Sequence, residues 1–538
     1  MINEGEFDDM NTDSRTKNAV MNAFFGIGMQ LLVVLCQFVG QTVFIKILSA
    51  EYLGLNGVFS NVLQFLSLAE LGIGGAITFS LYQPLAEKDE NMIRAIMRLY
   101  KTIYTVIGAI ILVGGIVTSY FLDYFITAPT SLGNIQILFI LFLMNSVVSY
   151  FFAYRRTLLI ADQRGYVDSL NQGLFKILQV VLQSVFLIMT KQYAVFLVIQ
   201  IFTTILSNYR VYSQTNKLYG FLKNKNEYQK IPRDVVSKLK KNAVGAFSSK
   251  IGTIIMFGTS NILISKFIGL AAVGVYSNYM LLLNSVSGLL NRALNSVSAT
   301  IANYIHSREP KKTNEKFFDY MYVVNFFSLM FGFVLAVVLN PFINLWLGEN
   351  FKLSEFTVAL LIFNWVLNLM RNTVLSFMTA YGTYWETRWK SVAEALTNLV
   401  VGVILISTTT MVVNAVIVAS IIVGIGINAW SEPYILLKKN ISFNKRKYVM
   451  RYGFYVSIAI DISLLTIYSP VHVKSNLLII VFASVVSVLI FTILFMLVTM
   501  QFEENKRFRK MFMGKIARTV SVRCAKKLDL QDSRVDDE

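Results

Sequence analysis

Long runs of apolar residues constrain the fold of this chain more than any other feature. Only 15% of the 538 residues are charged, whereas an average soluble domain has about 25%. The apolar runs are about 20 residues long, which is the length an α-helix needs to cross a bilayer. We therefore predict an all-α integral membrane protein with about 14 transmembrane helices. The predicted segments lie near 19–48, 55–82, 102–124, 134–154, 169–189, 192–211, 242–267, 271–303, 317–340, 355–381, 391–409, 411–435, 452–468 and 477–499.

The positions of the basic residues predict the orientation. The chain has 49 Lys and Arg residues and a net charge of +18. If the N-terminus is cytoplasmic, 40 of these residues fall on the cytoplasmic side and five on the opposite side. Loops that face the cytoplasm are normally rich in Lys and Arg. We predict that both termini are cytoplasmic, and the positive charge does not indicate a nucleic-acid partner.

A basic loop divides the apolar segments into two sets of six. Lys46 and Gly54 match Lys266 and Gly274 at one constant offset along the chain, which we call the repeat offset, and each pair lies at an outward turn. Because six is even, both halves enter the membrane in the same direction, which predicts a parallel repeat. The predicted regions are the cytoplasmic N-terminus 1–18, a six-helix bundle 19–211, the basic cytoplasmic linker 212–241, a second six-helix bundle 242–435, helices 13 and 14 at 452–499, and a basic cytoplasmic tail 500–538.

Polar residues gather on one face of four predicted helices, the first, second, seventh and eighth. Such stripes mark a wet cavity or a protein interior, because lipid-facing helices are apolar all round. The alternative is that small and amide residues join helices together. Stripes at equivalent places in both halves favour a central polar cavity. The cavity residues we expect to bind substrate are Gln30, Gln37, Gln64, Asn284, Asn291 and Asn295.

Placing a charged side chain at mid-membrane costs ~3 kcal/mol or more of free energy, so charged residues inside predicted helices indicate a function or a structural partner. Lys250 and Arg292 lie on the polar faces of the seventh and eighth segments, and we expect them to bind an anionic headgroup. The alternative is an internal salt bridge, for example from Arg292 to Glu70. Arg371 and Glu394 lie on neighbouring segments, and there we expect a structural pair.

Several classes of function lack the residues they need. The two Cys and two His residues exclude a disulfide scaffold and argue against a metal site. No Walker A motif is present. The predicted outward loops are short, whereas a membrane transferase or polymerase would need catalytic acids or His there. We predict neither an enzyme nor a resident cofactor. All seven Pro residues are expected in loops or at segment ends, so no proline break is expected in a spanning helix.

Two stretches resemble a known family. LSAEYLGLNGVFSNVLQFLSLAELGIGGAITFSLYQPLAEKD (48–89) resembles the opening of bacterial Wzx-type polysaccharide flippases, and VGVYSNYMLLLNSVSGLLNRALNSVSATI (273–301) resembles their seventh-to-eighth helix region. These flippases belong to the MOP superfamily, with the MATE multidrug exporters and the lipid II flippase MurJ. The resemblance implies two six-helix bundles around a central cavity lined by helices one, two, seven and eight. Fourteen segments exceed the twelve usual in the Wzx group and equal the number in MurJ.

The resemblance also implies a function and a location. The expected activity is the translocation of an undecaprenyl-pyrophosphate-linked oligosaccharide repeat unit across the bacterial cytoplasmic membrane, for synthesis of a cell-surface polysaccharide. A polysaccharide polymerase and glycosyltransferases are candidate partners. The coupling source would be the membrane potential or a proton or sodium gradient, with Glu70 as candidate site. The alternatives are a MurJ-like lipid II flippase, a MATE-like exporter, a membrane transferase or polymerase, and a scaffold for polysaccharide assembly.

Overall fold

The computed structural model confirms the predicted all-α membrane fold. It describes residues 28–70, 73–126, 132–223, 260–306, 310–381, 383, 386–409, 412–438, 444–468 and 476–510. Helices account for the regular structure of this part of the chain, and it contains no strand. Among the described residues, ten helices are long and apolar enough to cross a membrane, and an eleventh span is bent by 48° between Ile135–Phe151 and Tyr154–Ala161.

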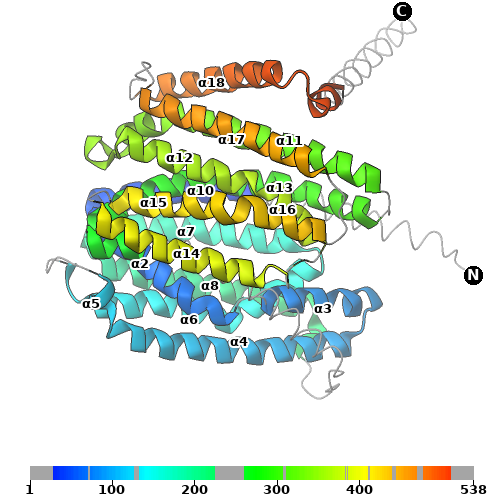
Figure 1. The fold of residues 1–538 in the computed structure, drawn as a ribbon. Coiled ribbons are helices and arrows are strands. Elements are labelled where there is room, and N and C mark those ends of the chain that lie inside the picture. The colour runs from blue at the N-terminus through cyan, green and yellow to red at the C-terminus, as the bar shows by residue number, and fades with distance from the viewer. Residues whose placement is uncertain are drawn as a thin grey trace, which may run out of the picture. The chain divides into compact units, whose positions relative to one another are not determined.

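The described helices overlap the predicted segments (Figure 1), and residues 242–259 of the seventh segment lie outside the described residues. The first is Gly28–Ile47. It is followed by α2 (Ala50–Leu66), η1 (Ser67–Glu70), α3 (Ile73–Glu87), α4 (Glu90–Ser119), α5 (Leu122–Phe125), α6 (Ile135–Ala161), α7 (Gly165–Thr190), α8 (Tyr193–Leu218) and η3 (Gly220–Lys223). After the helical residues 260–267 come α10 (Leu270–His306), α11 (Pro310–Leu347), η4 (Glu349–Phe351), α12 (Glu355–Met370), α13 (Asn372–Ala380), α14 (Arg388–Thr408), α15 (Val412–Val423), η5 (Gly424–Asn428), α16 (Ala429–Lys438), α17 (Lys445–Tyr468) and α18 (Leu477–Val498).

Polar residues fix where several helices begin. Asp89, Asn134 and Ser354 precede α4, α6 and α12, and each side chain accepts a hydrogen bond from a backbone N–H of the first turn, at 3.0 to 3.2 Å. Such caps satisfy amides that the helix leaves without a partner. They define the residues at which these three helices begin.

The prediction about proline is wrong at three positions. Pro84, Pro341 and Pro433 lie inside α3, α11 and α16. A proline within a helix removes one backbone hydrogen bond, but neighbouring helices and local adjustment make this tolerable in membrane proteins. These helices therefore run further than the apolar pattern indicates; α11 continues beyond Pro341 as far as Leu347.

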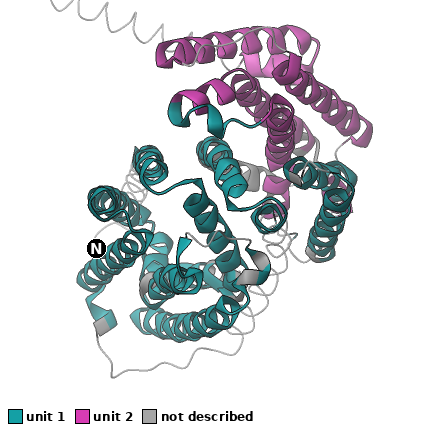
Figure 2. Cartoon of the chain, turned by 90° about the vertical axis from the view of Figure 1, so that its left-hand side faces the viewer, with its two compact units in different colours: residues 1–293, 346–353, 382–431 teal, residues 294–345, 354–381, 432–538 magenta. Residues whose placement is uncertain are grey.

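Two compact units divide the chain, as Figure 2 shows by colour. Unit 1 comprises residues 1–293, 346–353 and 382–431, and unit 2 comprises 294–345, 354–381 and 432–538. The segment 346–353 joins unit 1 through two contacts: Trp346 Nε1 donates to Thr42 at 2.6 Å, and Leu353 N donates to the Tyr279 hydroxyl at 2.9 Å. The division into two repeated six-helix bundles, 19–211 and 242–435, stays a prediction.

Candidate functional site: a neutral polar cavity

The first turns of α2 and α10 cross at two glycines. A Cβ placed on Gly54 would overlap the carbonyl oxygen of Leu270, and a Cβ placed on Gly274 would overlap that of Ala50. The two contacts are reciprocal, because the repeat offset relates Gly54 to Gly274 and Ala50 to Leu270. Only glycine lets two backbones approach this closely. We call this pair of contacts the glycine crossing.

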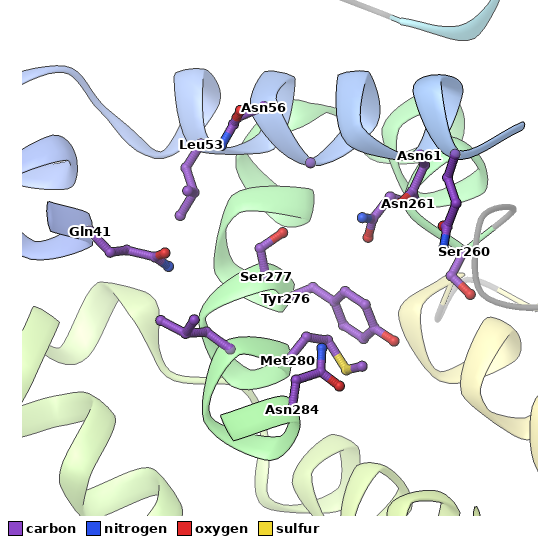
Figure 3. Close-up of a pocket in the computed structure, with 13 residues that line it drawn as sticks. Gln41, Leu53, Asn56, Asn61, Ser260, Asn261, Tyr276, Ser277, Met280 and Asn284 are labelled. Carbon is purple, nitrogen blue, oxygen red and sulfur yellow. The ribbon is translucent and has the colours of Figure 1, made fainter. Parts of the chain in front are cut away.

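A cavity of about 480 Å³ lies next to the glycine crossing, within unit 1. This volume is in the range of small-molecule binding sites, about 300–1,000 Å³. Figure 3 shows side chains of α2, α10 and helix 260–267 around it, with Ser277, Met280 and Asn284 projecting from α10. Its lining residues are Gln41, Leu53, Asn56, Gly57, Asn61, Gln64, Ser260, Asn261, Tyr276, Ser277, Met280, Leu281 and Asn284.

The cavity lining follows the same repeat offset as the glycine crossing. A Cβ on Gly57 would lie 3.2 Å from the hydroxyl of its counterpart, Ser277. The two helices therefore approach each other at equivalent residues, as expected if a local two-fold axis relates them. The lining residues related by this offset are Gln41 and Asn261, Asn56 and Tyr276, Gly57 and Ser277, Asn61 and Leu281, and Gln64 and Asn284.

None of the lining residues is charged, and most of the polar ones are amides. An amide side chain has two donor hydrogens and an acceptor oxygen, so it can either donate a hydrogen bond to a hydroxyl group or accept one from it. Gln41 Nε2 donates to Asn278 Oδ1 at 2.5 Å. The Oδ1 atom of Asn261 has no hydrogen-bond partner among the described residues. The chemistry of this cavity suits an uncharged ligand rich in hydroxyl groups.

The predicted substrate residues are distributed unevenly around this cavity. Gln64 and Asn284 line it. Gln30 lies beside α10, with its Nε2 atom 3.9 Å from a Cβ placed on Gly288. Gln37 is half-buried on helix 28–47 and Asn291 is exposed on α10, and neither lines the cavity. Lys250 and the side chains of Arg292 and Asn295 lie outside the described residues.

Four further amides, Gln41, Asn56, Asn61 and Asn261, line the cavity although we did not predict them as substrate ligands. A signal that could have found one of them is the repeat offset, which is evident at Lys46 and Gly54. Applied to Gln41, that offset leads to Asn261.

Glu70 lies apart from the cavity lining, in the short η1 turn. Its two carboxylate oxygens accept hydrogen bonds from Tyr104 at 2.5 Å and from Tyr150 at 2.7 Å. Tyr100 lies against Tyr104, with ring centroids 4.4 Å apart, and is hydrogen-bonded to Thr157. Within the described residues Glu70 has no ion-pair partner. The role of Glu70 in coupling stays a prediction.

The predicted pairing of Arg371 with Glu394 stays a prediction, because the two residues lie in different units. Within unit 2, Arg371 forms an ion pair with Glu432 at 2.6 Å, and the Glu432 side chain is only 2% exposed. Within unit 1, Glu394 pairs with Lys390, one turn away on α14, at 2.9 Å. Arg371 thus has a structural partner in its own unit. Asp461, also inside a predicted helix, is exposed on α17.

Comparison with solved structures identifies proteins with a similar fold. The chain is similar to the lipid II flippase MurJ in an inward closed conformation, at 15% identity and a TM-score of 0.62, over 88% of this chain and 98% of that one. A MATE transporter of Vibrio cholerae is 12% identical with a TM-score of 0.58, over 80% and 98%. A MOP superfamily transporter of Pyrococcus furiosus is 14% identical with a TM-score of 0.56, over 79% and 97%.

At these identities the likeness shows the fold alone: the chain has the fold of MOP superfamily transporters. No protein-family model matches the sequence, and no curated protein matches it. Among the described residues, no three His, Cys, Asp or Glu side chains gather closely enough to hold a metal ion.

Proposed function

We propose that this protein is a flippase that moves a lipid-linked oligosaccharide repeat unit, carried on undecaprenyl pyrophosphate, across the bacterial cytoplasmic membrane. The observation that carries the proposal is the cavity lined by uncharged amide and hydroxyl side chains. Sugars present many hydroxyl groups, each of which donates and accepts, and Asn and Gln match both roles. A polysaccharide polymerase and glycosyltransferases would be its functional partners.

The same cavity argues against a MATE-like exporter of cationic compounds. A cation buried away from water needs a compensating negative charge, and no acid lines this cavity. A lipid II flippase is the second candidate. It is supported by the similarity to MurJ over 88% of the chain, and lipid II also joins a sugar headgroup to a polyprenyl pyrophosphate. Both candidates share one chemistry, a hydroxyl-rich headgroup on a pyrophosphate-linked lipid.

The pyrophosphate would bind to Lys250 and Arg292. Arg binds phosphate through two parallel hydrogen bonds, and Lys acts as a mobile point charge. Losing one charge-assisted contact costs about 1.5–3 kcal/mol, or roughly ten- to a hundredfold in affinity. Arg292→Ala and Lys250→Ala should therefore each reduce transport at normal protein levels, and Arg292→Lys should retain part of it.

The decisive experiment blocks the cavity itself. Ser277→Trp places an indole between α2 and α10, where Ser277 faces Gly57, and should abolish transport of a lipid-linked oligosaccharide in proteoliposomes. Asn284→Ala and Gln64→Ala should each weaken transport about two- to tenfold, the effect of losing one neutral hydrogen bond. The matched control is Gln83→Ala, whose amide is exposed at the end of α3.

Two outcomes would contradict the proposal. Full transport by a stably inserted Ser277→Trp variant would show that the substrate does not use this cavity. Transport of lipid II but of no other lipid-linked sugar would assign the MurJ-like activity instead.

A further inference from the structure

A second hollow lies in unit 1, and its surface is apolar. It is a groove of about 370 Å³ lined by Val62, Phe65, Leu66, Thr118, Ile262, Leu263 and Leu399. Thr118 is the one polar residue in this lining, and its hydroxyl donates to the carbonyl of Gly114 at 2.7 Å within α4. A water molecule in such a space needs two to four polar partners, and this lining offers none that is free. The groove therefore suits a hydrocarbon chain.

The groove and the polar cavity share two helices. On α2, the cavity-lining Asn61 and Gln64 alternate with the groove-lining Val62, Phe65 and Leu66. At 100° per residue, all the α2 residues that line the cavity and those that line the groove are centred about 155° apart. Helix 260–267 does the same within one turn, because residues 260 and 261 line the cavity and residues 262 and 263 line the groove. A wall one helix thick thus separates a polar site from an apolar one.

Small residues lie along this wall and along the groove. A Cβ on Gly57 would lie 3.4 Å from Asn261 Nδ2, so α2 and helix 260–267 meet closely at that point. On the groove side, a Cβ on Gly114 would lie 3.2 Å from Leu66, and one on Gly402 would lie 3.7 Å from Leu263. Glycine at these places leaves the groove open; a larger side chain would project toward Leu66 or Leu263.

We propose that this groove holds the lipid chain of the molecule whose sugar headgroup occupies the cavity. The inference rests on the proposed function and extends it, because it names the binding site of the substrate's hydrocarbon chain. The argument is the wall that the two sites share: α2 and helix 260–267 present amides to one side and aliphatic or aromatic groups to the other. A substrate with a polar head and an apolar chain has this same division.

The groove orients the chain more than it attracts it. A lipid chain in the bilayer is already surrounded by hydrocarbon. Binding it in the groove therefore gains van der Waals contacts and not a hydrophobic transfer free energy. Any bulk lipid gains similar contacts along an apolar wall. The substrate chain is distinguished only because its headgroup is held on the other side of the wall, and the test must separate these two sources of hydrocarbon.

Leu399 and Leu396 make a matched pair for that test. Both lie on α14 and are exposed, by 36% and 59%, but only Leu399 lines the groove. A photoreactive benzoylphenylalanine at each position, in full-length protein in proteoliposomes, would be irradiated with a radiolabelled undecaprenyl-pyrophosphate oligosaccharide among unlabelled phospholipids. We expect several-fold more label on the protein with the probe at 399 than at 396, and competition by excess unlabelled substrate.

A second measurement guards against a photoprobe that disturbs folding. Leu399→Trp fills the groove and should slow transport several-fold, whereas Leu396→Trp adds the same bulk to the lipid-facing side and should leave it unchanged. Equal labelling at both positions, or equal transport by both Trp variants, would overturn the proposal and assign the groove to bulk lipid. The wild-type transport assay separates this failure from that of the proposed function, because transport by the wild type would stand in that case.

Discussion

Glu70 is the residue whose surroundings say most about energy coupling. Two tyrosine hydroxyls donate to its carboxylate, so the group is held in place without a neutralising cation among the described residues. Glu70→Gln keeps the shape and removes the titratable group. If transport is coupled at this residue, the variant should be inserted normally but should lose its dependence on a pH or sodium gradient. Transport in proteoliposomes with imposed gradients measures this.

The control for Glu70 is Glu349→Gln, whose carboxyl is 70% exposed beside Lys352. That variant should retain the gradient dependence of the wild type. An unchanged gradient response in Glu70→Gln would make Glu70 a structural residue that anchors Tyr104 and Tyr150.

Glu504 gives a pH prediction for unit 2. Its side chain is 2% exposed and lies 2.7 Å from Lys447 and 3.1 Å from Arg451. Burial alone would raise the pKa of Glu504, but the hydrogen bond from Lys447 and the charge of Arg451 outweigh burial and hold this pKa below its usual value of 4.5. A lowered carboxyl pKa stabilises the fold above the unfolded value, and this stability is lost as the pH falls through the folded value.

The measurement is thermal unfolding of the wild type and Glu504→Gln in detergent. At pH 7 the variant should unfold at a lower temperature, because removing one partner of a buried ion pair costs about 3 kcal/mol. The difference between the two proteins should shrink below pH 4.5. A difference independent of pH would mean that the Glu504 charge does not stabilise unit 2.

The pairing of side chains from different helices is the feature that the sequence predicts least well. Periodicity places Arg371 inside a helix and indicates that it needs an acid, but it cannot choose among acids on other helices. Within unit 2 a partner is Glu432, 61 residues away, because the end of α12 and α16 bring the two side chains together. Such adjacency depends on tertiary packing, which a helical pattern does not encode.

Among elements, the glycine crossing of α2 and α10 carries the clearest prediction. Gly54→Ala and Gly274→Ala each add a methyl group that overlaps a backbone carbonyl of the other helix. Because a backbone cannot rotate away as a side chain can, each variant should destabilise this arrangement, by about 1–3 kcal/mol, as overpacking typically does. The two effects should be similar, because the repeat offset makes the two contacts equivalent.

Gly453→Ala is the matched control, since a Cβ there meets nothing within 4 Å on α17. Replacing an open helical glycine by alanine is neutral or stabilising, by up to about 1 kcal/mol. Thermal unfolding of the three variants should separate the first two from the third. A Gly54→Ala variant as stable as Gly453→Ala would show that α2 and α10 do not cross at these residues.

The elements themselves are largely predictable, and the exceptions have physical causes. Segment 271–303 corresponds to α10, Leu270–His306, because a polar stripe does not interrupt a helix whose other face is apolar. Segment 55–82 is two helices, α2 and α3, joined by the η1 turn at Glu70. The sequence marks the polar residue there but gives no Pro or Gly signal within η1 itself.

At the scale of the whole molecule, composition predicts the class and the local pattern predicts most spans. In the part of the chain that the structure describes, ten helices pass as membrane spans by length and hydropathy, or eleven with the bent α6. Of the other predicted segments, α2 has only 17 residues and α10 carries the cavity amides. The described helices that a simple apolar criterion misses thus include two of those that line the cavity: α2 because it is short, and α10 because it carries polar residues.

The orientation of the chain is the remaining whole-molecule prediction, and it rests on 40 of 49 basic residues falling on one side. Both termini and the connection after α3 should be cytoplasmic, and the connection between α11 and α12 should face outward. The test uses Ala86→Cys, exposed at the end of α3, and Asn350→Cys, exposed in η4, each in a chain whose Cys36 and Cys524 are replaced by Ser.

A membrane-impermeant thiol reagent on whole cells should label the cysteine at 350 and leave the one at 86 unlabelled until the membrane is permeabilised. Both variants should react equally in detergent, which controls for local accessibility. The opposite pattern would reverse the orientation. It would also place the end of the cavity next to the glycine crossing toward the cytoplasm, because Gly54 and Gly274 lie at the same predicted outward turns as Lys46 and Lys266. The direction in which a headgroup enters the cavity would then be reversed too.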